Sequence, residues 1–150
     1  TGNDAEARQL ISTKQEDEMV EKIQKSEKEW RDQLPPEQYR VARERETEKR
    51  FSHPEHNAKV TGVYHCVCCG APLFKASTKF DSGTGWPSFW TPVSEDAIET
   101  RPDLRYEDDL TEVVCARCDA HLGHVFEDGP EPTGLRYCIN GVCMTREDAK

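Results

Sequence analysis

The stretches that decide the fold are two short cysteine pairs, Cys66-Val67-Cys68-Cys69-Gly70 and Cys115-Ala116-Arg117-Cys118. Each has the Cys-x-x-Cys spacing in which one tight turn presents two sulfurs to the same metal ion. Four thiolates saturate Zn²⁺, so the expected site is structural and leaves no position open for water. One Zn²⁺ per chain is predicted, with the ligands Cys66, Cys69, Cys115 and Cys118. Cys68 would then be a spare thiol, and two buried or disulfide-bonded pairs are the simpler alternative.

The amino-acid composition describes a small acidic protein with a modest hydrophobic core. The chain has 150 residues, of which 35% are hydrophobic and 33% charged, which suits one domain with an appendage. A bound metal would supplement such a core, because its binding energy contributes to folding. The net charge of −9 argues against nucleic-acid partners, whose phosphates repel an acidic surface, and against anionic membranes. We therefore expect no nucleic acid and no membrane among its partners.

Cysteine usage and hydropathy predict a cytoplasmic protein. The chain has seven cysteines, and two metal-binding pairs with a reactive thiol suit a reducing cytosol better than a disulfide framework. No stretch of 18 apolar residues predicts a transmembrane helix, and no signal peptide is visible. A periplasmic or other location is the alternative.

Charge and texture divide the chain into a flexible N-terminal extension at residues 1–18, a helical arm at 19–50 and a zinc-binding β catalytic domain at 51–150. Because 24 of the first 50 residues are charged, the arm is expected to be a solvated segment held by a few apolar anchors. An amphipathic helix that ends before Pro35-Pro36 is predicted from apolar residues at helical spacing, namely Met19, Ile23, Trp30 and Leu34. A second short helix is predicted over residues 37–50.

From about residue 60 onward, short apolar runs alternate with Gly, Pro, Asp and Ser. Residues 80–85 and 127–130 are rich in turn formers and predict loops. Residues 111–115 and 135–139 predict strands. Because no helical period persists in this part of the chain, we expect a body that is all-β or nearly so, built from short antiparallel strands.

Residues near the end of the chain predict a reactive thiol. If residues 135–140 are extended, Arg136, Cys138 and Asn140 point to the same face. A guanidinium beside a thiol favours the thiolate and lowers its pKa, while Asn140 could orient a substrate or a water. A buried structural cysteine is an equally good interpretation of Cys138 alone.

Two imidazoles and several aromatic rings add to this candidate site. His121 and His124 follow Cys118 closely, and either could act as a general acid near neutral pH. They could instead be metal ligands, but four thiolates already suffice. Trp86 follows a glycine-rich loop and is well placed to wall a shallow pocket, whereas core packing is the simpler role for Phe89 and Trp90.

The segment after Cys138 allows two geometries. Asn140-Gly141 is the strongest two-residue hairpin signal in the chain, and a turn there would make Cys138 and Cys143 facing cross-strand partners within disulfide reach. A straight strand would instead place them about 16 Å apart, at about 3.3 Å per residue, which is too far for a disulfide.

Four longer motifs, in order along the chain, resemble those of the B-type methionine sulfoxide reductases. They are Tyr64-His65-Cys66-Val67-Cys68-Cys69-Gly70, Phe80-Asp81-Ser82-Gly83-Thr84-Gly85-Trp86-Pro87-Ser88-Phe89, Ala120-His121-Leu122-Gly123-His124-Val125-Phe126 and Gly134-Leu135-Arg136-Tyr137-Cys138-Ile139-Asn140. The resemblance covers roughly residues 26–144. The start also fits, because Trp30 and Leu34-Pro35-Pro36-Glu37-Gln38-Tyr39 are similar to that family's N-terminal segment.

The resemblance implies a mainly β fold of antiparallel sheets, barrel-like or tent-like, with short N-terminal helices and a structural zinc site. It implies a thiol-dependent enzyme that reduces the R-epimer of methionine sulfoxide in oxidised proteins, with thioredoxin as the reductant. It places the nucleophile at Cys138, with His121, His124, Asn140 and Arg136 as further catalytic groups and with Trp86 and Phe126 against the substrate methyl group. A monomer is expected.

The implied chemistry passes through a sulfenic acid. The Cys138 thiolate attacks the sulfoxide sulfur while His121 or His124 protonates the oxygen, and methionine leaves. The chain departs from the family pattern at Thr84, where many relatives carry a second, resolving cysteine. Cys143 stands in a segment where relatives commonly have serines, so Cys143, Cys68 or no cysteine could resolve the intermediate. We expect no obligatory intramolecular disulfide.

Two rival functions come from other classes. A zinc ribbon that binds nucleic acid predicts a basic face, against which the net charge argues. A zinc-stabilised protein-interaction module needs no Arg136-Cys138-Asn140 face. Turnover of an R-sulfoxide with dithiothreitol would separate all three functions.

Overall fold

Short antiparallel strands make up most of the regular secondary structure, which confirms the predicted fold class. The computed structural model describes residues 22–56, 58–105 and 110–147, so the predicted extension at residues 1–18 lies outside the described residues. The strands are β1 (Val63–Cys66), β2 (Pro72–Lys75), β3 (Lys79–Phe80), β4 (Ser88–Phe89), β5 (Ile98–Asp103), β6 (Leu110–Cys115), β7 (His121–Phe126), β8 (Arg136–Ile139) and β9 (Met144–Glu147). The 3-10 turns η2 (Ala76–Thr78) and η3 (Gly141–Cys143) lie between them.

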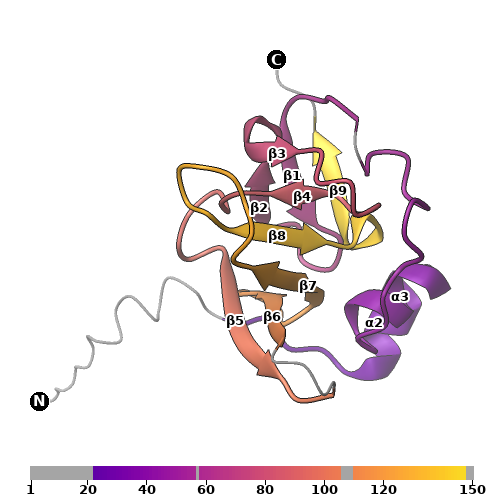
Figure 1. The fold of residues 1–150 in the computed structure, drawn as a ribbon. Helices are drawn as coiled ribbons and strands as arrows, with labels where there is room; N and C mark the ends of the chain where they lie inside the picture. Colours follow the sequence, from indigo (N-terminus) through magenta and orange to yellow (C-terminus); the bar gives the residue numbers. More distant parts are fainter. Residues whose placement is uncertain (1–21, 57, 106–109, 148–150) are drawn as a thin grey trace, which may run out of the picture.

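In the described part of the chain, the strands form a three-stranded and a six-stranded sheet (Figure 1). The smaller sheet has the order β2-β1-β9, and the larger sheet has the order β3-β4-β8-β7-β6-β5. β8 therefore lies inside the larger sheet, where it pairs with β4 on one side and β7 on the other. The strands predicted at residues 111–115 and 135–139 are confirmed as β6 and β8.

Aromatic side chains from both sheets meet in the core. Phe74 of β2 stacks on Phe89 of β4 with ring centroids 4.5 Å apart, and Tyr64 of β1 meets Phe89 edge-on at 5.2 Å. All three side chains are almost fully buried. Because each Å² of apolar surface removed from water contributes about 25 cal/mol, this cluster helps to hold the two sheets together. The structure therefore supports core packing, the simpler role given above, for Phe89.

The first helix of the arm, α2 (Glu27–Gln33), starts later than the sequence pattern predicts. The amide of Glu29 donates to the Ser26 hydroxyl, and the amide of Ser26 donates to the Glu29 carboxylate. This capping box fixes the helix start, so Ile23 precedes the helix. Met19 lies outside the described residues. The predicted anchors Trp30 and Leu34 are both buried.

The second helix, α3 (Pro36–Ala42), ends well before residue 50, so the prediction of a helix over 37–50 is wrong in its second half. Three residues beyond the helix, Arg45 has a φ of 63°, and its guanidinium donates to the carboxylate of Glu112 at 2.7 Å. This buried carboxylate needs a charged partner, and that contact draws residues 43–50 across the larger sheet. α3 itself packs against η3 and β7. Neither helix in the described residues is long and apolar enough to cross a membrane.

The chain after β8 follows neither of the two geometries considered for it. Asn140 and Gly141 do not form a hairpin turn, because η3 carries the chain out of the larger sheet and β9 then pairs with β1 in the smaller one. The dipeptide signal fails here because the Asn140 side chain is buried and hydrogen-bonded to two other segments. Cys143 is fully buried, and its thiol donates to the carbonyl of His121.

Candidate functional site

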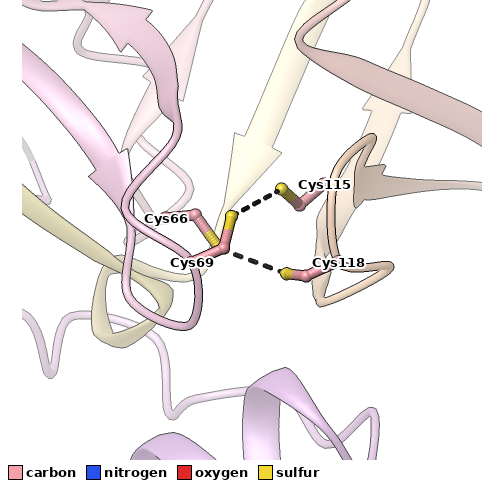
Figure 2. Close-up of side chains that lie close together, drawn as sticks. All are labelled: Cys66, Cys69, Cys115 and Cys118. Carbon is pink, nitrogen blue, oxygen red and sulfur yellow. Dashed lines mark hydrogen bonds between the residues drawn. The ribbon is translucent and has the colours of Figure 1, made fainter. Parts of the chain in front are cut away.

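The two Cys-x-x-Cys turns bring their four sulfur atoms into one cluster (Figure 2). The Sγ atoms of Cys66, Cys69, Cys115 and Cys118 all lie within 4.8 Å of one another. The Cys66 and Cys118 sulfurs are 3.6 Å apart, and so are those of Cys69 and Cys115. A tetrahedral ion with metal–sulfur bonds of about 2.3 Å separates its ligands by about 3.8 Å. The four thiols therefore have the spacing of a metal cage.

The two turns share one backbone geometry. The amide of Gly70 donates to the carbonyl of Cys66, and the amide of Asp119 donates to the carbonyl of Cys115. Gly70 and Asp119 also share a left-handed backbone, with φ values of 80° and 63°. A left-handed residue after the second cysteine turns the chain back so that both sulfurs stay on one side of the turn. Glycine adopts this conformation without a steric penalty, and aspartate is among the residues that tolerate it best.

The four-cysteine cluster joins the two sheets. Cys66 ends β1 of the smaller sheet, whereas Cys115 ends β6 of the larger one. The guanidinium of Arg43 donates to the carbonyl of Cys118 at 3.0 Å, which ties the arm to the same point. Cys66, Cys115 and Cys118 are at most 2% exposed. A metal ion at the cluster would therefore connect both sheets and the arm.

A second cysteine environment lies at β7 and β8, where Cys138 faces an open pocket of about 270 Å³. We call this cavity the Cys138 pocket. Cys138 and Arg136 come from β8, and His124 and Phe126 come from the adjacent β7. Asn140 directly follows β8, and the remaining side chains come from the arm and from the loop before β4. The lining residues are Thr47, Arg50, Thr84, Trp86, Gly123, His124, Phe126, Arg136, Cys138 and Asn140.

The Cys138 thiol has few polar neighbours. His124 is its direct cross-strand partner in the β7–β8 register, and the Thr84 hydroxyl lies 3.9 Å from its sulfur. Burial raises the pKa of Cys138 above its usual value, and it outweighs the hydrogen bond from Thr84 and the nearby charge of Arg136, which both lower that pKa. The effect predicted for Arg136 therefore has the expected direction, but desolvation is the larger influence.

Glycine is required at position 123, where β7 pairs with β8. A Cβ atom at this position would lie 2.0 Å from the backbone oxygen of Cys138. Only glycine allows such a close approach of the two strands. The Gly between the two histidines therefore sets the position of the thiol-bearing strand.

Arg136 is fixed by a carboxylate and by an aromatic ring. Its guanidinium donates to both oxygens of Asp128, at 2.8 and 3.1 Å. The same group lies 4.3 Å from the centre of the Phe126 ring. The bidentate pair and the ring together hold a planar cation at the edge of the pocket.

Glu48 of the arm connects three parts of the Cys138 pocket. Its carbonyl accepts from the indole N–H of Trp86, and its amide donates to the side-chain oxygen of Asn140, each at 3.0 Å. Its carboxylate accepts from the amide of Val142 at 2.9 Å. Glu48 is 4% exposed, and burial raises the pKa of its carboxyl group. Trp86 and Asn140 are therefore held by contacts with the arm as well as by the loop before β4 and the end of β8.

The two histidines differ in access to the pocket. His124 lines it, and its Nε2 atom lies 2.8 Å from the carboxylate of Asp103. His121 is 1% exposed, and its Nδ1 atom lies 2.7 Å from the carboxylate of Glu112. Burial lowers the pKa of His121 below its usual value, although the Glu112 charge acts in the opposite direction. The two rings meet edge-on at 5.6 Å.

The carboxylates behind the histidines are themselves paired with arginines. Asp103 and Glu112 are 2% and 3% exposed. Arg45 donates to both, and Arg105 donates to Asp103 at 2.8 Å. Hydrogen bonds from Arg105 and His124 hold the pKa of Asp103 well below its usual range. Each imidazole therefore has a buried carboxylate partner that also accepts hydrogen bonds from arginine.

The structure brings most of the predicted site residues together. The four predicted metal ligands form one cluster, and Cys68 is buried in the core instead of joining it. Six predicted residues line the Cys138 pocket, namely Cys138, Arg136, Asn140, His124, Trp86 and Phe126. His121 is the exception, because it is buried behind His124.

The sequence analysis missed the supporting groups. Glu112 is the one charged residue of β6, a strand that is otherwise apolar or uncharged, and a carboxylate in such a strand signals a buried partner. Asp103 lies between Arg101 and Arg105 in a polar segment and gives no comparable signal. Glu48 and Arg50 sit in the charged arm, where one charge does not stand out from another.

Comparison with known proteins shows which family this chain resembles over most of its length. The SelR domain model matches residues 34–148. The chain is 56% identical over 125 residues to the peptide methionine sulfoxide reductase MsrB of Pseudomonas fluorescens (strain Pf-5), which covers 83% of this chain and 96% of that protein. It is 57% identical over 126 residues to the protein of the same name from Pseudomonas putida (strain W619), which covers 83% and 94% of the two chains. The Pseudomonas syringae pv. syringae protein is 55% identical over 125 residues, covering 83% and 95%.

Proposed function

The chain belongs to the SelR domain family, and on that premise we propose that it reduces methionine sulfoxide in peptides and proteins back to methionine. The substrate is the R-epimer at sulfur, as the resemblance to the B-type enzymes implies. The role is the repair of oxidised proteins, because the sulfoxide turns a flexible apolar side chain into a polar one and the reaction restores it.

The observation that carries this proposal is the composition of the Cys138 pocket. A thiol, an imidazole and a guanidinium converge on it, from Cys138, His124 and Arg136, while the rings of Trp86 and Phe126 supply apolar walls. A methyl sulfoxide has the matching pattern, with an apolar methyl group, an electrophilic sulfur and a basic oxygen. The pocket thus offers each part of the substrate a complementary group.

The chemistry follows from these groups. The Cys138 thiolate attacks the sulfoxide sulfur and forms an S–S bond, while His124 gives a proton to the oxygen, which leaves as water after taking up a second proton from solvent. Water then adds to the Cys138 sulfur, the S–S bond breaks with its electrons on methionine, and a sulfenic acid stays on Cys138. Burial raises the pKa of Cys138 and so disfavours the thiolate, whereas the nearby charge of Arg136 lowers that pKa and stabilises the thiolate. The hydrogen bond from Thr84 also lowers the pKa of Cys138, so both Thr84 and Arg136 increase the fraction of thiolate.

His124 is the proton donor in this proposal, and His121 supports it from behind. His124 lines the pocket opposite Cys138, whereas His121 is buried. Asp103 and Glu112 orient the two rings through their hydrogen bonds.

The four-cysteine cluster holds one Zn²⁺ in this proposal. Thiolates at near-tetrahedral spacing suit zinc, and a four-thiolate site has no open position for a substrate. The ion therefore contributes folding energy and joins the sheets, and the reaction takes place on the chain's own residues in the Cys138 pocket.

We infer that recycling needs no internal disulfide. Thr84, not a cysteine, is the residue beside Cys138. Cys143 and Cys68 are buried, and Cys143 is hydrogen-bonded to the backbone of His121. Two external thiols, such as the pair of a thioredoxin, would reduce the sulfenic acid directly. One becomes bonded to Cys138 and the other releases it, which yields a disulfide on the reductant and one water.

The activity is tested with a peptide that carries methionine R-sulfoxide or S-sulfoxide and with dithiothreitol as reductant. We expect turnover of the R-epimer alone. Failure of the metal-loaded, folded protein to reduce either epimer would refute the proposed function.

The recycling route is tested by counting free thiols after reduced enzyme meets one equivalent of R-sulfoxide. We expect the loss of one thiol, in wild type and in Cys143→Ser alike. If wild type loses two thiols and Cys143→Ser loses only one, then Cys143 resolves the sulfenic acid.

A further inference from the structure

The Cys138 pocket has a charged rim that the reduction of a sulfoxide does not require. Among the described residues that line it, the charged side chains are Arg50 and Arg136, and no lining residue is a carboxylate. The sulfoxide itself is neutral, and Arg136 already lies beside Cys138. The sulfoxide therefore gives no reason for a further positive charge at Arg50. The charge is also unusual for its surroundings, because the protein as a whole has a net charge of −9.

Arg50 differs from Arg136 in its surroundings. Arg136 is bound by Asp128, whereas within the described residues no ion pair is formed by Arg50. Arg50 is exposed, and its guanidinium lies 5.5 Å from the centre of the Phe51 ring and 5.6 Å from that of Trp86. The two rings hold the cation at the rim and leave its hydrogen-bond donors to solvent or to a ligand.

Phe51 beside it is an exposed aromatic ring on a strained backbone. Its side chain is 56% exposed, one of two such large apolar side chains among the described residues. Its φ of 64° is rare for a bulky residue and costs free energy. Such strain persists where surrounding contacts impose it, and it is concentrated at functional sites.

Contacts with the loop before Trp86 impose this conformation. The amide of Phe51 donates to the carbonyl of Gly85 at 2.7 Å. A Cβ atom at Gly85 would lie 2.9 Å from Arg50 Cβ and from Phe51 Cδ2, so only glycine lets the two segments pack this closely. Arg50 and Phe51 are thus fixed to the same loop that supplies Thr84 and Trp86 to the pocket.

We propose that Arg50 and Phe51 form a subsite for the polypeptide on either side of methionine sulfoxide, and that this subsite favours an acidic residue there. This inference rests on the proposed function, and it adds the kind of sequence that the enzyme prefers. Arg50 binds the carboxylate of a neighbouring Glu or Asp with its planar group of donors. Phe51 supports the aliphatic part of the same side chain or of the next one.

The test compares three peptides that differ only in the residues flanking methionine R-sulfoxide, which are Glu, Gln or Lys on both sides. For wild type at low salt we expect kcat/KM to be about two- to fivefold higher with Glu than with Gln, the size of an exposed ion pair, and lower with Lys. The preference is expected to shrink as salt is raised.

The matched variants are Arg50→Glu and Lys49→Glu, which change the net charge equally. Lys49 is exposed and does not line the pocket. We expect Arg50→Glu to reverse the order of the Glu and Lys peptides and Lys49→Glu to keep it. Arg50→Lys is expected to retain part of the preference, because it keeps the charge and loses the planar group.

Phe51→Asn removes the ring while keeping a residue that tolerates positive φ. We expect it to lower the ratio of peptide kcat/KM to that of N-acetylmethionine R-sulfoxide, whereas an unchanged ratio would remove Phe51 from the subsite. A wild-type enzyme that reduces all three peptides equally, or an Arg50→Glu variant that keeps the wild-type order, would overturn the inference. An enzyme that reduces none of these substrates would instead refute the proposed function.

Discussion

The four-cysteine cluster and the Cys138 pocket use the same side chain in opposite environments. The cluster cysteines face one another with sulfur separations of 3.6 Å for two pairs, and three of them are almost completely buried. Cys138 faces a threonine, an arginine and an open pocket. Four cysteine sulfurs that face one another can together bind a metal ion. A single thiolate that faces hydrogen-bond donors and an open pocket can instead attack a substrate. The partners of each sulfur, more than its burial, separate a structural role from a reactive one.

The cluster and the pocket also differ in how they depend on the rest of the fold. The cluster needs only two tight turns and the pairing that brings them together. The pocket needs β7, β8, the loop before β4 and the N-terminal arm at once. Loss of the cluster should therefore damage the pocket, while loss of the reactive thiol should leave the cluster intact.

The largest expected effect follows from removing one ligand of the cluster. Cys118→Ser should lose the bound metal and the fold together, because a structural zinc site contributes about 10–16 kcal/mol and a whole domain has a stability of about 5–15 kcal/mol. Metal analysis and thermal unfolding measure both quantities. Cys68→Ser is the matched control, since Cys68 is buried nearby and lies outside the cluster, and it should keep one equivalent of metal. A Cys118→Ser protein that folds normally without metal would contradict a structural role for the ion.

The reverse pattern is expected at the reactive thiol. Cys138→Ser should lower kcat/KM by about a thousandfold or more, as removal of a nucleophile does, while metal content and the unfolding temperature stay as in wild type. Cys143→Ser should retain most of the activity, because its hydroxyl can still donate to the carbonyl of His121. Substantial turnover by folded Cys138→Ser would remove Cys138 from the mechanism.

The same contrast explains which features the sequence predicts. The Cys-x-x-Cys spacing is local, so the metal ligands follow from it directly, and the alternation in residues 135–139 places Arg136 and Cys138 on one face. The supporting groups are distant in the chain: Glu48 contacts Asn140 across 92 positions, and Arg45 contacts Glu112 across 67. No short-range pattern encodes such pairs. The helix over residues 37–50 fails for this reason, since the long-range contacts of Arg45 and Glu48 override local helix propensity.

The third expected effect concerns the carboxylate behind the histidine of the pocket. Asp103→Asn keeps the size of the side chain but removes the charge that faces His124, so kcat should fall about 10- to 100-fold and KM should change less. Glu99→Gln is the control, because Glu99 lies on the same strand and its side chain is 42% exposed. Both variants should keep their metal, but Asp103→Asn should unfold at a lower temperature than Glu99→Gln, because it removes the buried carboxylate that pairs with Arg105, so kcat is compared at a temperature where both are folded. An Asp103→Asn variant that raises KM and keeps kcat would make His124 a binding group and not a proton donor.

The smallest expected effect comes from removing a single hydroxyl group, that of Thr84, from beside Cys138. The hydrogen bond from Thr84 lowers the pKa of Cys138, although burial keeps that pKa above the usual value of a thiol. Thr84→Val removes the hydroxyl, so the pKa of Cys138 should rise and less thiolate is present at neutral pH. We therefore expect kcat/KM to fall about two- to fivefold near pH 7, the value of one modest hydrogen bond.

The pH dependence separates this cause from a change of shape. The rising limb of kcat/KM should move to higher pH in Thr84→Val, and the deficit should disappear above the raised pKa, where both enzymes carry the thiolate. Thr84→Ser keeps the hydroxyl that lies 3.9 Å from the Cys138 sulfur, so its profile should follow wild type. If Val and Ser displace the limb equally, the shift follows from the changed shape of the side chain and not from the loss of the hydroxyl, and the hydrogen bond from Thr84 does not set the pKa of Cys138.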